Sequence, residues 1–127
     1  KKDRVEDAIY ATKAALKEGI VPGAGIALHN AADSVDTKVV TEQILLNAIK
    51  TPYKTILDNA HIAYGPNMKE GYGVNVVTGE NCDLVKEGII DPVLVTKTAL
   101  INAISVATTI LSADCVISNI RINESGK

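Results

Sequence analysis

Two aspartates in contrasting settings are the side chains of this sequence best suited to chemistry. Asp7 lies in the middle of a charged helix-like segment, "RVEDA", about 160° or more around an ideal helix from its apolar stripe. A carboxylate in that position is either solvated or available to a ligand. Asp91 precedes Pro92 in "IIDP", which is the usual order of an N-cap and the first residue of a helix. An N-cap aspartate requires no further function.

A glycine-rich turn, "GIVPGAGIAL" at residues 19–28, is the other candidate feature. Such turns before helices bind phosphates in several protein classes, but the patterns GxxxxGK[ST] and GxGxxG are both absent. Spacing therefore favours a structural turn over a phosphate contact, and both interpretations stay open at this point.

Other reactive residues have no informative spacing. His29 and His61 fall in different predicted helices, and Cys82 and Cys115 are far apart, so neither pair predicts a metal site. No Ser-His-Asp set is apparent. We expect both cysteines to be reduced, as in a cytosol-like compartment.

Composition and charge exclude several classes of function. The net charge is −2 over 127 residues, so the basic surface typical of nucleic-acid or membrane binding is lacking. No apolar run approaches the ~20 residues that cross a bilayer, and "KKDRVEDAIY" is a charged helix start rather than a signal peptide. We expect neither nucleic acid nor membrane as a partner.

Apolar periodicity predicts a mainly α-helical domain. Helices are expected over 3–18, 24–33, 36–50, 51–64 and 92–113. In the first helix the apolar stripe is Val5, Ile9, Thr12 and Leu16, with Ala11, Ala14 and Glu18 beside Asp7 on the second face. The last helix is apolar on nearly all sides and is expected at the buried centre.

Strands are expected in two places only. The glycine-rich segment from Gly65 predicts a small β-hairpin, with Val74, Val76 and Val77 in a strand and a turn at "TGEN". Residues 115–122 alternate and predict a terminal edge strand, which is an association site because it lacks a partner within the chain. The residues alone thus indicate a helical domain with a small β-hairpin and a terminal edge strand, part of an assembly.

In order along the chain, four stretches resemble the C-terminal part of a group I chaperonin of the GroEL/Hsp60 type. They are "KKDRVEDAIYATKAALKEGIVPGAGIAL", "GYGVNVVTGE", "GIIDPVLVTKTAL" and "ISVATTILSADCVISN". The resemblance implies that residues 1–18 are the last helix of an intermediate domain. Residues 19–127 would be the C-terminal half of the equatorial ATP-binding domain, a helical bundle.

The resemblance also implies roles for individual residues. Asp7 matches the aspartate that positions the attacking water in ATP hydrolysis, and Asp91 matches the one at the ribose hydroxyls. Asn75 and Val76 match residues beside the adenine, and Ile89 matches an apolar contact with the base. The family commonly has alanine at the positions of Val76 and Val77.

The glycine-rich turn matches a Gly-Gly-Gly turn whose middle residue lies close to the nucleotide sugar. In this chain the turn is Gly23-Ala24-Gly25, so Ala24 adds a Cβ where the family has none. If that position requires φ > 0, alanine costs about 1 kcal/mol or more.

The implied function is that of an ATP-dependent chaperonin that encloses unfolded polypeptides and assists their folding. Its expected partners are identical subunits in a sevenfold ring, single or double, a small co-chaperonin and unfolded client proteins. ATP with Mg²⁺ is the expected cofactor, with the phosphate loop and magnesium ligands mostly outside this segment, which alone should not hydrolyse ATP. The implied location is the bacterial cytoplasm, or an organelle matrix in a eukaryote.

Two alternatives remain. The first is a stand-alone helical oligomerisation or interaction module with no ATP role. The second is an unrelated small nucleotide-binding protein, for which Asp7 and Asp91 would face unconnected surfaces.

Overall fold

The chain is mainly helical, with two small antiparallel strand pairs, as the sequence predicts. A computed structural model describes residues 2–65, 70–115 and 117. The helices are α1 (Lys2–Glu18), α2 (Ile26–Asp33), α3 (Val40–Ile49), α4 (Thr51–Asn59) and α5 (Val93–Leu111), and the strands are β1 (Ile20–Pro22), β2 (Tyr72–Asn75), β3 (Glu80–Asp83) and β4 (Ile90–Pro92). The predicted terminal strand lies outside the described residues except for Cys115 and Ile117, neither of which is in a strand.

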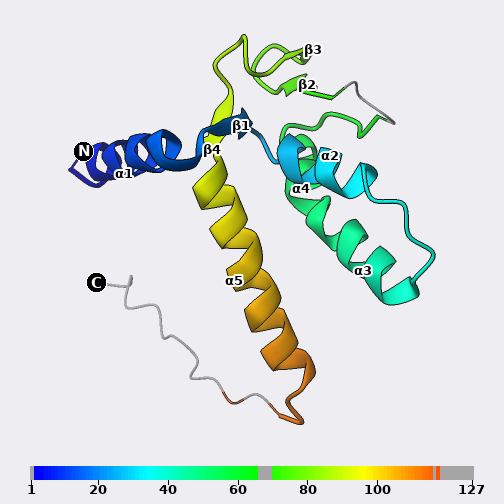
Figure 1. Cartoon of the computed structure of the whole chain (residues 1–127). Helices are drawn as coiled ribbons and strands as arrows, with labels where there is room; N and C mark the ends of the chain where they lie inside the picture. The colour runs from blue at the N-terminus through cyan, green and yellow to red at the C-terminus, as the bar shows by residue number, and fades with distance from the viewer. Residues whose placement is uncertain (1, 66–69, 116, 118–127) are drawn as a thin grey trace, which may run out of the picture.

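The β1–β4 pair is the centre from which the other elements extend (Figure 1). Its register places Ile20 opposite Pro92 and Val21 opposite Asp91. From this β1–β4 pair α1 leaves in one direction and α5 in another. Helices α2, α3 and α4 lie together across α5 from α1, and the β2–β3 hairpin lies above α2 and α4 (Figure 1). This pairing was not expected from the sequence.

Residues with positive φ end two of the helices. The Gly19 backbone (φ +84°) terminates α1, and its N–H donates to the Ala15 carbonyl at 2.8 Å. In α4 the helix stops at Asn59, five residues before the predicted end, because His61 adopts φ +56°. The Ile62 N–H then donates to the Leu57 carbonyl at 3.0 Å, which is the closing bond of a Schellman motif.

Two predicted helix starts are too early. Helix α2 begins at Ile26 rather than residue 24, because Ala24 and Gly25 form the turn before it. Helix α3 begins at Val40 rather than residue 36. There the Thr37 hydroxyl accepts a hydrogen bond from the Val39 N–H at 3.1 Å, and such a local bond competes with the helix.

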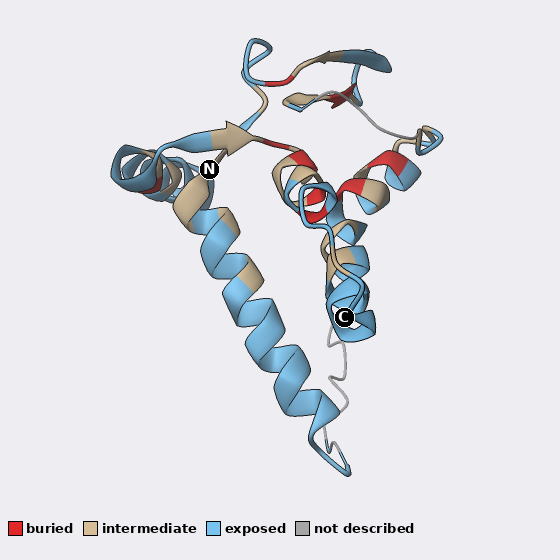
Figure 2. Cartoon of the chain, turned by 45° about the vertical axis from the view of Figure 1, so that its right-hand side comes forward, coloured by how far each residue is buried: buried red, intermediate tan, exposed pale blue. Residues whose placement is uncertain are grey.

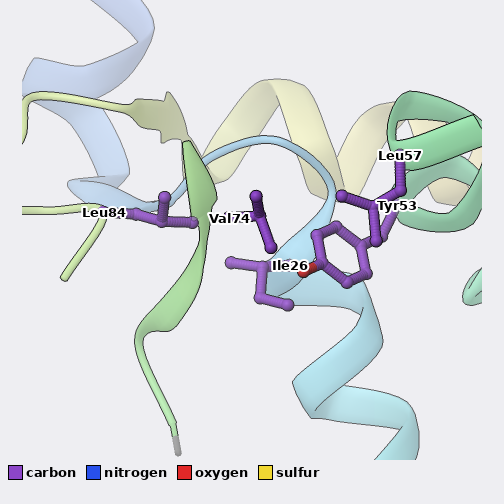
Figure 3. Close-up of a cluster of buried hydrophobic side chains, with 5 residues drawn as sticks. All are labelled: Ile26, Tyr53, Leu57, Val74 and Leu84. Atoms are coloured by element: carbon purple, nitrogen blue, oxygen red, sulfur yellow. The ribbon is translucent and has the colours of Figure 1, made fainter. Parts of the chain in front are cut away.

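A small hydrophobic core joins α2, α4 and the hairpin. The side chains of Ile26, Tyr53, Leu57, Val74 and Leu84 converge there, each at most 7 % exposed (Figure 3). The Leu84 side chain packs closely over β2, since a Cβ on Gly73 would lie 2.7 Å from Leu84 Cδ1. The predicted turn is shifted, because Val76 and Val77 lie in the turn and Glu80 already belongs to β3.

Helix α5 is not the buried centre that its composition predicts. None of its residues is buried, and Figure 2 shows it exposed along most of its length. By length and composition it also qualifies as a candidate membrane span, with a mean hydropathy of 1.6 over 18 residues, which corrects the expectation that no apolar run approaches that length. A single such helix is weak evidence for a span, because core helices have the same composition.

Helix α1 packs through a different face from the predicted one. The apolar stripe is exposed, with Val5 at 59 % and Leu16 at 84 %. The buried residue is Ala14, on the small second face, and α1 packs there against β4 and α5. Small side chains allow two backbones to approach closely, so the alanine face rather than the apolar stripe makes the contact.

Candidate functional site

The glycine turn is hydrogen-bonded to the segment before β4. The Gly23 N–H donates to the Ile89 carbonyl at 2.9 Å, although 66 residues separate the two positions in sequence. A Cβ on Gly23 would lie 3.2 Å from that carbonyl group, so the backbone approach is tight. The structure therefore brings together two of the residues expected at a nucleotide.

Ala24 and Gly25 both adopt left-handed backbone conformations, with φ of +56° and +76°. Ala24 therefore has the positive φ that the sequence analysis identified as unfavourable for alanine. An L-residue with a Cβ is destabilised by about 1 kcal/mol or more in this region. Gly25 has a further constraint, since a Cβ there would lie 2.9 Å from the Tyr53 backbone nitrogen. The turn therefore lies close to both the segment before β4 and helix α4.

Asp91 lies in β4 rather than at a helix N-cap, so the N-cap prediction is wrong. The N-cap of α5 is Pro92, and no side chain caps that helix. The reason is the β1–β4 pairing, which keeps Asp91 extended opposite Val21. Asp91 is half-buried, and its carboxylate does not cap the N-terminus of α5. It can therefore accept hydrogen bonds from a ligand such as a vicinal diol.

Asn75 and Val76 lie on the hairpin. The Asn75 Oδ1 accepts a hydrogen bond from the Val77 N–H at 3.0 Å, and its carbonyl accepts one from Gly79 at 2.8 Å. Asn75 therefore has a structural role in the turn, which leaves its side-chain NH₂ as a donor. Val76 is 40 % exposed. The hairpin and Ile89 meet through the core, because Ile89 packs on the cluster that contains Val74.

Asp7 lies on the same face of α1 as Ala14, but it is exposed. Seven residues separate them, so Asp7 lies about 10 Å along the helix axis from the buried alanine. Asp7 therefore lies on the same face as the buried Ala14, nearer the N-terminus of α1, and is solvent-accessible.

Two contacts fix the C-terminal end of α1, and the sequence analysis predicted neither of them. The Lys97 ammonium on α5 donates to Glu18 Oε2 at 2.6 Å, and the Val93 N–H donates to the Gly19 carbonyl at 3.1 Å. Glu18 and Lys97 have opposite charges, but their separation in the chain gives no local signal of pairing.

A buried polar cluster around His29 was also missed. His29 is 5 % exposed, and its Nε2 lies 2.5 Å from the Tyr64 hydroxyl. Its Nδ1 lies 3.2 Å from Asp33 Oδ2, and Asp33 Oδ1 accepts from Lys50 at 2.5 Å. Burial lowers the pKa of His29, and the Lys50 hydrogen bond lowers the pKa of Asp33. The sequence signal is the His29–Asp33 spacing of four, which puts both side chains on one face of α2.

The described residues fit one part of a magnesium nucleotide better than another. Asp91 and the backbone of the turn suit a sugar, and Ile89 suits a flat apolar group. No three His, Cys, Asp or Glu side chains gather as metal ligands in the part of the chain that the structure describes. A metal ion and phosphates would need ligands from outside the described residues.

Comparison with known protein families places this chain among the chaperones that act in protein folding. Residues 1–121 match the sequence model of the TCP-1/cpn60 chaperonin family. The match covers nearly all of the 127 residues, and the chain belongs to that family.

Proposed function

We propose that this chain is the C-terminal segment of a group I chaperonin subunit, of the GroEL/Hsp60 type, that uses ATP to assist protein folding. Residues 1–18 would end the intermediate domain, and residues 19–127 would form the C-terminal half of the equatorial domain. The observation that carries the proposal is the Gly23–Ile89 hydrogen bond of 2.9 Å. It joins two distant segments expected at the same nucleotide, and Asp91 follows two residues later.

In this proposal the β1–β4 pair and the turn form one wall of an adenosine site. The Asp91 carboxylate accepts hydrogen bonds from both ribose hydroxyls, and the tight backbone at Gly23 and Ala24 lies along the sugar. Ile89 and Val76 offer apolar contacts to the base, with Asn75 beside them. The support is that Asp91 is half-buried and caps no helix.

Asp7 would act on water. A carboxylate accepts a hydrogen bond from the attacking water and orients it in line with the terminal phosphorus. Because α1 joins the rest of the chain at Gly19, rotation there would carry Asp7 inward while the Gly19 end stays in place. ATP and Mg²⁺ supply the cleavable phosphate and its charge neutralisation when bound, and residues from the rest of the subunit would hold them.

The proposed partners follow from this assignment: identical subunits in a sevenfold ring, single or double, a small co-chaperonin, and unfolded polypeptides. The exposed apolar faces of α1 and α5 support the need for covering surfaces. The proposed location is the bacterial cytoplasm or an organelle matrix.

The test is Asp7→Ala in the longer protein that carries a phosphate-binding segment. We expect ATP binding to persist and turnover to fall roughly 10²-fold or more, as for loss of a water-orienting group. Asp3→Ala is the control, because Asp3 is also exposed on α1 and has no proposed role. Wild-type turnover in Asp7→Ala would refute the assignment, and so would hydrolysis of Mg-ATP by the 127-residue chain.

A stand-alone interaction module without an ATP role is the second candidate. The observation that favours it is α5, which is 19 residues long with none buried. The upstream reading frame discriminates between the two, because a phosphate-loop motif of the "GDGTT" type there supports the ATPase and its absence supports the module.

A further inference from the structure

We propose that His29, Tyr64 and Asp33 form an acid-sensitive latch that holds the chain leaving α4 against α2, and that protonation of His29 opens it. This acid latch does not depend on the proposed ATPase function. It rests on the geometry of one buried imidazole and on the charges around it.

The imidazole is clamped between two oxygens. Its Nε2 lies 2.5 Å from Tyr64 Oη, and its Nδ1 lies 3.2 Å from Asp33 Oδ2. Nδ1 is a buried nitrogen that makes no hydrogen bond in the described structure, so its contact with Asp33 is that of a nearby opposite charge. Such atoms are uncommon in folded proteins and call for an explanation, which the charges around the ring provide.

The neutral ring suits this arrangement. A neutral imidazole has one N–H and one acceptor nitrogen. With the Asp33 carboxylate beside Nδ1, the proton belongs on Nδ1, and Nε2 accepts a hydrogen bond from the Tyr64 hydroxyl. A second proton would occupy Nε2, and the Tyr64 hydroxyl could then no longer donate to it.

The surroundings oppose the second proton. His29 is 5 % exposed, and the Tyr53 ring from α4 lies against it at 5.4 Å between centroids. Lys50, at the junction of α3 and α4, already pairs with Asp33 at 2.5 Å, so its positive charge offsets part of the attraction that the Asp33 carboxylate exerts on a protonated His29. Lys54 from α4 lies 5.0 Å from the Tyr64 ring centroid and adds positive charge on that side.

The pKa of His29 agrees with this balance. Burial lowers it below 6.5, Asp33 opposes that shift, and Lys50 and Lys54 add to it. Because the folded pKa is depressed, the unfolded chain takes up the proton first as the pH falls below 6.5. Stability is therefore lost progressively from about pH 6.5 down through the folded pKa.

Tyr64 is the moving part of the acid latch. It follows the end of α4, is 41 % exposed, and has its hydroxyl on His29. Protonation of His29 buries a positive charge and removes the hydrogen bond that the Tyr64 hydroxyl donates to Nε2. Both effects favour a state in which Tyr64 moves away from His29 and water reaches the imidazole. Opening would begin at Tyr64, while the apolar core around Leu57 stays packed.

The experiment is an NMR titration of the full chain from pH 7.5 to 5. The variant His61→Asn leaves His29 as the sole histidine, and asparagine tolerates the positive φ at that position. We expect the His29 ring to titrate with a midpoint below 6.5 and the Tyr64 ring signals to shift with the same midpoint. Tyr64 signals that stay unchanged through the His29 midpoint, or a midpoint at or above 6.5, would overturn the proposal.

Two variants test the direction of each contact. Tyr64→Phe removes the donor to the neutral ring, so the His29 midpoint should rise toward 6.5. Asp33→Asn removes the only nearby negative charge among those named above, so the midpoint should fall. Unchanged midpoints in both variants would show that the geometry does not control protonation, which would also overturn the acid latch.

Discussion

Glu18 and Lys97 form an ion pair of 2.6 Å between α1 and α5, across 79 residues of sequence. The pair lies beside Gly19, whose carbonyl accepts a hydrogen bond from the first residue of α5. The side chains are 33 % and 54 % exposed, so solvent screens their attraction. Together these contacts fix one end of α1, and the rest of the helix extends from it.

Glu18→Gln should loosen α1 without unfolding the chain. A screened pair contributes at most about 1 kcal/mol, so hydrogen exchange in the last turns of α1 should accelerate by about 5-fold or less. Glu6→Gln is the control, because the Lys2–Glu6 pair is 4.0 Å long and far more exposed. Equal exchange in wild type and Glu18→Gln would contradict a role for the pair in holding α1.

Ala24→Gly should stabilise the chain by about 1 kcal/mol, because glycine adopts φ +56° without a Cβ penalty. The measurement is urea unfolding with an unchanged slope. Ala31→Gly is the control: Ala31 is exposed within α2, so glycine there should cost about 1 kcal/mol instead. Destabilisation by Ala24→Gly would mean that the Cβ of Ala24 makes contacts worth more than the strain.

Gly25→Ala should be more damaging than Gly79→Ala, although the two glycines have nearly the same φ of +76° and +75°. A Cβ on Gly25 would lie 2.9 Å from the Tyr53 nitrogen, whereas a Cβ on Gly79 would meet nothing within 4 Å. Gly79→Ala thus measures the backbone cost, about 1–2 kcal/mol, and the excess in Gly25→Ala measures the contact with α4. Equal losses in denaturant unfolding would show that α4 yields without cost.

Leu57→Ala should cost about 2–5 kcal/mol, because Leu57 is fully buried in the cluster that joins α4 to the hairpin. Leu16→Ala is the matched control, since Leu16 is a helix residue at 84 % exposure. Thermal or urea unfolding distinguishes them. A loss below 1 kcal/mol in Leu57→Ala would mean that the cluster does not carry the stability of this region.

Lys86→Met should raise the pKa of Asp83 toward 3.8. The Lys86 ammonium hydrogen-bonds that carboxyl, at 3.1 Å, and is the largest cause of its depressed pKa. The backbone N–H of Lys86 also donates to the Asp83 carboxylate, at 3.3 Å, so the variant should keep part of the lowering of the Asp83 pKa.

Because the folded pKa of Asp83 is lowered, its stabilisation is present above pH 3.8 and is lost as the pH falls through the folded pKa. Carboxyl NMR titration measures this, with Lys17→Met as the control, and an unchanged Asp83 pKa contradicts it.

Local patterns predicted the helices, whereas long-range pairing determined the site. The helices all form near their predicted places because their signals lie within the segments. Their ends were less predictable: His61 with φ +56° is not a glycine, so nothing in its residue type marks the end of α4. The packed face of α1 was misassigned because hydrophobicity favoured Leu16, whereas the small Ala14 allows closer contact.

The candidate site could be proposed from resemblance but not from spacing. The contact of Gly23 with Ile89 depends on the β1–β4 pair, whose strands have three residues each and lie about 70 positions apart. Such short strands carry no periodic signal. The same pairing turned Asp91 from a predicted helix cap into a strand residue.

The exposed α5 helix would make the stability of this chain depend on concentration in the proposed assembly. Burying apolar surface is worth roughly 25 cal/mol per Å², and α5 keeps most of its apolar surface in water, with Leu111 at 87 % and Ile101 at 59 % exposure. That free energy is released only on association, so a surface that covers α5 would raise the melting temperature by mass action. If the chain assembles as proposed, its folding and its assembly form one coupled equilibrium.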